Sequence, residues 1–126
     1  MKPDPKKIRL AALLGFLAVA LGAFGAHGLQ PALIEHGTVE IWKTASHYHL
    51  VHAVVLLVLA FVHTDDAPAR WSWSCLTWGV LIFSGTLYTL AITGTKWLGA
   101  ITPVGGLLML TGWLLLAIRR WPGTVP

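Results

Sequence analysis

The chain has 126 residues, of which 56% are hydrophobic and only 11% are charged, and it carries a net charge of +4. Soluble domains have about a quarter of their residues charged, so this composition, with a mean hydropathy of +0.70, excludes an ordinary soluble protein. The length fits one domain over residues 1–126. The basic residues flank apolar stretches without forming a continuous patch, which argues against nucleic-acid binding.

Four stretches contain no Asp, Glu, Lys or Arg, and they cover residues 10–34, 44–64, 71–95 and 97–118. Each has the roughly 20 residues that an α-helix needs to cross a hydrocarbon core about 30 Å thick. We therefore predict an all-α integral membrane protein with transmembrane helices over about residues 10–27, 45–63, 73–94 and 101–120. Short connections place consecutive helices side by side, so the expected fold is an antiparallel up-down bundle of four helices.

The basic residues are distributed unequally between the two ends of this bundle. Only Lys43 and Lys96 lie at one end, whereas seven lie at the other: Lys2, Lys6, Lys7, Arg9, Arg70, Arg119 and Arg120. The positive-inside rule then places both termini in the cytoplasm. The basic start and the later AFGAHG also resemble a signal peptide. Because the apolar run is longer than a usual signal core and three spans follow, we favour an uncleaved first helix.

The first span has small residues at 4-3-4-3 spacing, which places them on one stripe: Ala11, Gly15, Ala18, Gly22 and Gly25. Small residues let helix backbones approach closely within a bilayer, so this stripe predicts the face that packs against a neighbouring helix. The outer connection that follows, residues 29–43, is predicted to hold a short interfacial helix broken near Gly37. Trp42 is expected to anchor this connection at the level of the lipid headgroups.

The third span carries Thr77, Ser84, Tyr88 and, just past its end, Thr95 at heptad-like spacing. A polar stripe on a membrane helix should face protein rather than lipid. The fourth span starts at Thr102 and Pro103, and we expect Thr102 to cap that start. Gly105 and Gly112, a heptad apart, predict close packing of this helix. The single cysteine, Cys75, excludes an intrachain disulfide.

The segment TASHYHLVHA places His47, Tyr48, His49 and His52 within six positions of the second span. At 100° per residue Tyr48, His49 and His52 share one arc, whereas His47 points away from it. The antiparallel topology then gathers a candidate polar cluster in the outer half of the membrane: His27, Tyr48, His52, Ser84, Tyr88 and Thr102. His36, His47 and His63 are expected to be interfacial surface residues.

Three interpretations of this cluster remain open. In the first, which we favour, His27, His52 and the hydroxyls satisfy one another and fix the helix register, and neither a metal nor a cofactor is expected. In the second, His27 and His52, with His49 as a weaker candidate, bind haem b or a divalent metal. In the third, His52 carries a proton in a small transporter or proton-linked channel. No intramembrane carboxylate and no nucleophile motif supports an enzyme.

Four motifs stand in a recognisable order: LGAFGAHGL (21–29), WKTASHYHLVHA (42–53), IFSGTLY (82–88) and ITPVGG (101–106). Together they resemble the family called domain of unknown function 423, whose members are small bacterial inner-membrane proteins similar to the eukaryotic transmembrane protein 256. The resemblance implies four transmembrane helices in the bacterial inner membrane, and it carries no established reaction or cofactor. It also implies a set of family-pattern positions: Gly22, Gly25, His27, Thr44, Tyr48, His52, Ser84, Gly85, Tyr88, Thr102, Pro103, Gly105 and Gly106.

In this family the position of His49 often holds glutamine, so the resemblance favours His27 and His52 as the better histidine pair. The function expected from the sequence is therefore structural or accessory. The protein would be a bundle that binds membrane lipids, or a small subunit of a larger membrane complex or homo-oligomer, without enzymatic activity.

Overall fold

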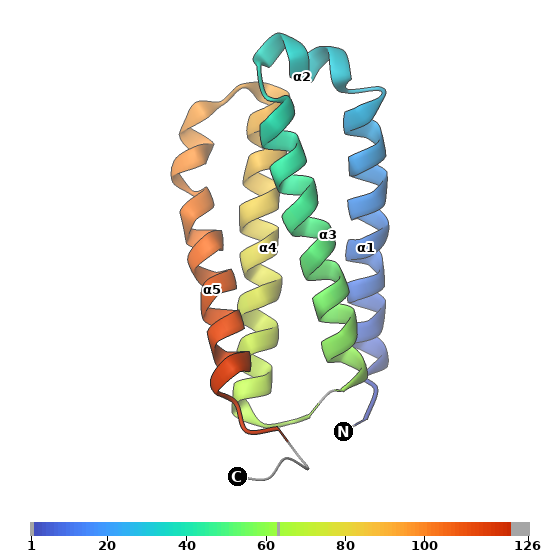
Figure 1. Cartoon of the computed structure of the whole chain (residues 1–126), viewed down its shortest axis with the longest axis vertical. Coiled ribbons are helices and arrows are strands. Elements are labelled where there is room, and N and C mark those ends of the chain that lie inside the picture. The colour runs from blue at the N-terminus through green and yellow to red at the C-terminus, as the bar shows by residue number, and fades with distance from the viewer. Residues whose placement is uncertain (1, 63, 122–126) are drawn as a thin grey trace.

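The computed structural model describes residues 2–62 and 64–121, and within these ranges the chain is mainly helical, with short connections between the helices (Figure 1). The elements, in chain order, are α1 (Pro5–Ala26), α2 (Gln30–His36), α3 (Val39–Phe61), α4 (Ala67–Thr93), the 3₁₀ helix η1 (Lys96–Ala100) and α5 (Thr102–Ile118). Four segments are long and apolar enough to cross a membrane: Pro5–Ala26, Val39–Phe61, Ala67–Thr93 and Lys96–Ile118. The prediction of an all-α protein with four transmembrane helices is confirmed.

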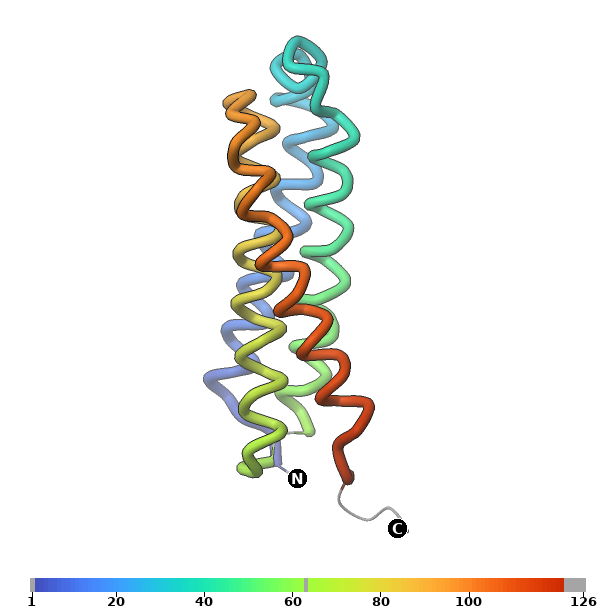
Figure 2. The backbone as a smooth tube through the Cα atoms, turned by 90° about the vertical axis from the view of Figure 1, so that its left-hand side faces the viewer, coloured from blue at the N-terminus to red at the C-terminus, as the bar shows by residue number. Residues whose placement is uncertain are grey.

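The four long helices run antiparallel, and the start of α1 lies at the same end of the molecule as the end of α5 (Figure 1). Backbone contacts join α1 to α3, α3 to α4 and α4 to α5. Among the described residues no such contact joins α1 to α4 or to α5. Turning the molecule by 90° shows that α5 is inclined to α4 (Figure 2). The helix α3 is therefore the element that connects α1 to the rest of the bundle.

Three helices begin earlier than the sequence predicted. Helix α4 starts at Ala67 rather than near residue 73, where the Asp66 side chain accepts a hydrogen bond from the Ala69 backbone N–H at 2.9 Å. Helix α1 starts at Pro5 rather than near residue 10, because the Asp4 side chain accepts hydrogen bonds from the backbone N–H groups of Lys6 and Lys7 at 3.0 and 3.3 Å. Proline fits this first turn because its missing N–H needs no partner there. Helix α3 starts at Val39 rather than near residue 45, with Thr38 as its cap residue after the left-handed Gly37 that ends α2. The predicted short helix with a break near Gly37 is thus present.

The expectation that Thr102 caps α5 is wrong. Thr102 is the first helical residue, and Ile101 occupies the cap position without a side-chain hydrogen bond. The Thr102 hydroxyl lies within 3.2 Å of the Leu98 carbonyl oxygen and shares a hydrogen bond of 2.7 Å with the Thr86 hydroxyl. The preceding 3₁₀ turn displaces the helix start by one residue, so Thr102 links α5 to α4 instead.

The small-residue stripe of α1 forms its contact with α3, as predicted. A Cβ atom at Gly22 would lie 3.1 Å from the Ser46 hydroxyl oxygen, and one at Gly25 would overlap the Trp42 indole. The α4–α5 contact depends on glycines in the same way: a Cβ at Gly112 would lie 2.6 Å from Leu76 Cγ. Glycine lets these backbones approach closely, which is how membrane helices gain packing contacts.

At the end that holds the termini, short polar contacts connect the helices. The Asp4 backbone N–H donates to the Ala60 carbonyl at 2.9 Å, which joins the start of α1 to the end of α3. The Arg119 guanidinium, just past α5, donates to the Asp66 carboxylate at 2.8 Å and to the Thr64 hydroxyl. These bonds attach the end of α5 to the loop between α3 and α4.

Candidate functional site

His52 lies on α3 and is 4% exposed, and both of its ring nitrogens have partners. Nδ1 lies 2.7 Å from the Tyr48 carbonyl oxygen, one turn earlier, and Nε2 accepts the indole N–H of Trp113 at 3.0 Å. Because Nε2 accepts this hydrogen bond, the proton of the neutral imidazole belongs on Nδ1, where it is donated to Tyr48. The histidine therefore connects α3 to α5. Trp113 was missed by the sequence analysis because its spacing gives no sign of a partner across the bundle.

His49 is also buried, and its ring Nδ1 lies 2.9 Å from the Tyr88 hydroxyl on α4. The Ser46 hydroxyl is a further partner of Tyr88. Next to them, the Ser84 hydroxyl donates to the Ala45 carbonyl at 2.8 Å. A polar seam therefore joins α3 to α4, and it confirms that the polar stripe of the third span faces protein at Ser84 and Tyr88. His49 was discounted in favour of His27, yet it belongs to this seam.

His27 and His52 are not brought together, although the sequence analysis preferred them as a pair. Gly25 on α1 lies against Trp42 on α3, so His27 lies level with the first turns of α3, near Ile41. His52 is eleven residues further along that helix, which is about 16 Å at 1.5 Å per residue. His27 itself follows α1 as its exposed C-cap residue. The helical projection correctly placed His52 on the face of α3 that points into the bundle. It carried no information on how far along the helix axis α1 is shifted relative to α3.

These positions do not fit the haem or metal site considered from the sequence. Two nitrogens bound to one metal ion at about 2 Å each lie no more than about 4 Å apart, far less than the separation of His27 and His52. Among the residues that the structure describes, no three His, Cys, Asp or Glu side chains gather in a metal-binding group. The two nitrogens of His52 are moreover engaged by Tyr48 and Trp113.

The remaining candidates lie in separate places. Tyr48 is 41% exposed, and its ring packs against Phe83 with centroids 4.8 Å apart. Thr102 is joined to Thr86 at the α4–α5 contact. His36 and His47 lie at the surface, and His63 lies outside the described residues. The six predicted residues thus divide among the α3–α4 seam, the α3–α5 contact, the α4–α5 contact and the exposed end of α1.

Trp42 is not the headgroup anchor that the sequence predicted. It is only 3% exposed, and its indole N–H donates to the Leu21 carbonyl on α1 at 3.0 Å. Its ring also packs against Tyr88, with centroids 4.6 Å apart. The missing side chain at Gly25 makes room for the indole, so Trp42 turns inward and forms one wall of a cleft.

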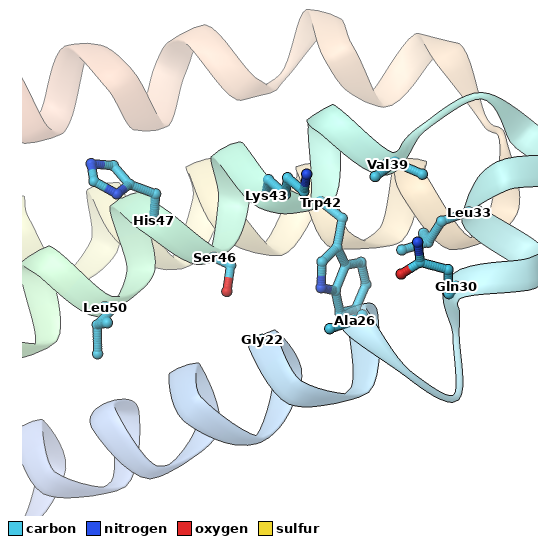
Figure 3. A pocket seen from close by; sticks show the side chains of 11 residues that line it. Gly22, Ala26, Gln30, Leu33, Val39, Trp42, Lys43, Ser46, His47 and Leu50 are labelled. Atoms are coloured by element: carbon cyan, nitrogen blue, oxygen red, sulfur yellow. The ribbon is translucent and has the colours of Figure 1, made fainter.

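This cleft lies between α1 and α3 beneath α2, at the end of the bundle opposite the termini, and has a volume of about 500 Å³ (Figure 3). Its lining comes from three helices: Gly22, Gly25, Ala26, Gln30, Leu33, Val39, Trp42, Lys43, Ser46, His47 and Leu50. In Figure 3, Ser46 and Leu50 point toward α1, whereas Lys43 and His47 extend along the opposite edge of α3. The cleft therefore has an apolar floor and one polar edge.

The polarity of the cleft changes along its length. Gln30 and Lys43 lie at the end near α2, Ser46 and His47 one turn deeper, and Leu50 a further turn along α3. Seven residues separate Lys43 from Leu50, a depth of about 10 Å at 1.5 Å per residue. If α2 lies at the membrane surface, this order follows the bilayer itself, with polar groups at headgroup level and apolar groups in the hydrocarbon.

A smaller cavity of about 170 Å³ lies between α1 and α4, over α3. Its walls are mainly leucines, and His49, Ser84 and Tyr88 line its base. The polar atoms of these three residues are engaged. His49 bonds to Tyr88 and to the Leu14 backbone on α1, and Ser84 bonds to the Ala45 carbonyl on α3. The cavity thus offers mainly apolar surface, and the larger cleft is the better candidate binding site.

Four helices that are long and apolar enough to span a membrane, joined by short connections, define a small multi-pass membrane protein. Comparison with known proteins agrees, since residues 21–106 match the family model described as "Protein of unknown function (DUF423)". The chain therefore belongs to the DUF423 family, which confirms the resemblance noted in the sequence.

Curated relatives cover most of the chain. It is 44% identical over 112 residues to a UPF0382 membrane protein of Staphylococcus epidermidis, covering 88% of this chain and 91% of the relative. It is 40% identical over 115 residues to UPF0382 membrane protein YwdK of Bacillus subtilis (88% and 92%), and 37% identical over 114 residues to a UPF0382 membrane protein of Schizosaccharomyces pombe (86% and 96%). No solved structure matches. The names of these relatives describe membrane proteins and mention no reaction.

Proposed function

We propose that this protein is a non-enzymatic accessory protein of the membrane that binds a lipid in the cleft between α1 and α3. The cleft is the observation that carries the proposal. Its volume of about 500 Å³ falls within the range of roughly 300 to 1,000 Å³ that small-molecule sites occupy. Its apolar floor and single polar edge match a molecule with an apolar chain and a polar head.

The residues that shape the cleft support a binding role. Gly22 and Gly25 keep α1 free of side chains where it faces α3, and the buried Trp42 closes one end. The Trp42 indole is held by the Leu21 carbonyl and by its packing against Tyr88, so this wall is fixed before any ligand enters. A preformed wall lowers the entropic cost of binding.

In this proposal the protein lies in the bacterial inner membrane, with the start of α1 and the end of α5 in the cytoplasm. The excess of Lys and Arg at that end supports this orientation. The cleft then opens in the outer leaflet. A reporter that is active only in the cytoplasm should be active when it is fused to the C-terminus. Activity of a reporter that works only in the periplasm would contradict this orientation.

The binding function is tested by native mass spectrometry of protein released from lipid nanodiscs. We expect wild-type protein to retain one lipid molecule per chain. Leu50→Trp places a larger side chain in the cleft and should release this lipid. The matched control is Val58→Trp, also on α3, which is 57% exposed and lies outside the cleft. Equal lipid retention by Leu50→Trp and Val58→Trp would contradict the proposal.

A further inference from the structure

We propose that the lipid in this cleft is a phospholipid, with its phosphate at Lys43 and one acyl chain extending past Gly22 toward Leu50. This inference rests on the proposed lipid-binding function and adds the chemical class of the ligand. It is carried by the position of the Lys43 ammonium group at the polar edge of the cleft, above its apolar part.

The Lys43 ammonium is free to take a new partner. Among the described residues it pairs with Glu40, one turn earlier on α3, at 3.4 Å. The side chains of Lys43 and Glu40 are 68% and 85% exposed. Exposed pairs of this kind contribute little, so exchanging the Glu40 carboxylate for a phosphate costs little. Lysine binds phosphate as a compact point charge, which requires no fixed orientation of the ligand.

Deeper in the cleft, Ser46 offers the next polar group. Its side chain points toward α1 in Figure 3, into the space that Gly22 leaves open. A hydroxyl one turn below Lys43 lies about 5 Å further into the membrane, at the depth of the ester groups that follow the phosphate of a phospholipid. Ser46 can donate a hydrogen bond to one of these ester oxygens in exchange for its bond to the Tyr88 hydroxyl.

Below Ser46 the cleft is apolar. Leu50 lines this part of the cleft, and Gly22 on α1 lies level with Ser46, where a Cβ atom would crowd the Ser46 hydroxyl. An acyl chain has no polar atoms that need hydrogen bonds, so it fits this apolar part of the cleft. A polar headgroup placed here would find no hydrogen-bond partners. The order of ammonium, hydroxyl and apolar surface therefore matches one phospholipid entering from the outer leaflet.

The test compares a phospholipid with a diacylglycerol that carries the same acyl chains, each titrated into the purified full-length protein in nanodiscs. Retained lipid is counted by native mass spectrometry. Wild-type protein should prefer the phospholipid by about fivefold, the factor expected for an exposed charge pair near the top of its usual range. Lys43→Gln should abolish this preference while diacylglycerol binding stays unchanged.

Lys96→Gln is the matched control, because Lys96 is the other cation at this end of the bundle and lies outside the cleft. It should keep the preference of the wild type. Equal binding of the two lipids to wild-type protein, or a preference that survives Lys43→Gln, would overturn the phosphate assignment and leave lipid binding intact. If neither lipid is retained by wild-type protein, the proposed function itself fails.

Discussion

The Trp113 indole donates its N–H to His52 Nε2 at 3.0 Å, and this hydrogen bond joins α5 to α3, two helices without a backbone contact. The rings meet nearly edge to face, with centroids 5.9 Å apart. Both nitrogens of His52 are satisfied by this bond and by the Tyr48 carbonyl. A histidine inside a membrane is stable when it stays neutral and fully bonded, which is the state that these partners provide.

The first prediction concerns this bond. Trp113→Phe removes the indole N–H and leaves the buried His52 Nε2 without its donor. An unsatisfied buried polar group costs about 1 to 3 kcal/mol, so the midpoint of thermal unfolding in detergent should fall. Circular dichroism at increasing temperature measures this midpoint. The control is Trp78→Phe on α4, where the side chain is 62% exposed, and it should change the midpoint little. Equal midpoints for the two variants would contradict the role of Trp113.

The second prediction separates a hydrogen-bonding role of His49 from a role that needs an imidazole. His49→Gln keeps a polar group beside the Tyr88 hydroxyl and should preserve most of the stability. His49→Leu leaves that hydroxyl without the partner it has at 2.9 Å and should cost about 1 to 3 kcal/mol. Chemical unfolding in mixed micelles compares the two variants. If glutamine were as harmful as leucine, the hydrogen bond would not be what His49 supplies.

The sequence predicted the helices well because a bilayer imposes strict demands on length and charge. It also predicted the contact faces of α1 and α5, since Gly25 and Gly105 follow a regular helical spacing. It could not predict where one helix lies along another. A shift of a few residues keeps every face the same, so the apparent pairing of His27 with His52 was wrong for a reason that spacing alone does not reveal.

The cleft was likewise hidden from the sequence. Trp42 was assigned to the headgroup level because tryptophan is common at membrane surfaces. The structure turns it inward, where Gly25 on another helix makes room for the ring. Because this arrangement depends on two residues that are far apart in the chain, a pattern within either helix cannot show it. Assembly into a larger membrane complex or a homo-oligomer stays a prediction.

The third prediction tests that fit. Gly25→Ala adds a Cβ atom that overlaps the Trp42 indole, and crowding of this kind costs about 1 to 3 kcal/mol. Trp42 should be displaced, and the midpoint of thermal unfolding, measured by circular dichroism, should fall. The control is Gly85→Ala, because nothing lies within 4 Å of a Cβ atom there. Alanine favours helix over glycine, so this control should be neutral or stabilising. Equal destabilisation at both positions would refute the account of Gly25.

The fourth prediction concerns pH at the end of the bundle that holds the termini. Hydrogen bonds from the Thr64 hydroxyl, from the Ala69 N–H and from Arg119 hold the pKa of Asp66 below its ordinary value of 3.8. Because the pKa is lower in the folded state, the carboxylate contributes stability above pH 3.8 and loses it as the pH falls through the folded value. Wild-type protein should therefore exceed Asp66→Asn in stability at neutral pH, and the difference should shrink in acid.

Unfolding midpoints of wild type and Asp66→Asn, measured between about pH 2 and pH 7, follow this difference. The control is Glu35→Gln, an exposed carboxylate on α2 at the opposite end of the molecule. Its difference from wild type should not follow the same acid transition. A difference for Asp66→Asn that stays constant down to the lowest pH would show that the ionised carboxylate does not stabilise the connection to Arg119.

The central claim is that the cleft between α1 and α3 holds a lipid, and photo-crosslinking in native membranes tests it most directly. A phospholipid with a diazirine in its acyl chain labels the residues that it contacts, and mass spectrometry of peptides locates them. We predict strong labelling near Gly22 and Leu50, which line the cleft. Labelling spread evenly over lipid-exposed positions such as Leu107 and Leu110, which are 65% and 66% exposed on α5, would contradict the claim.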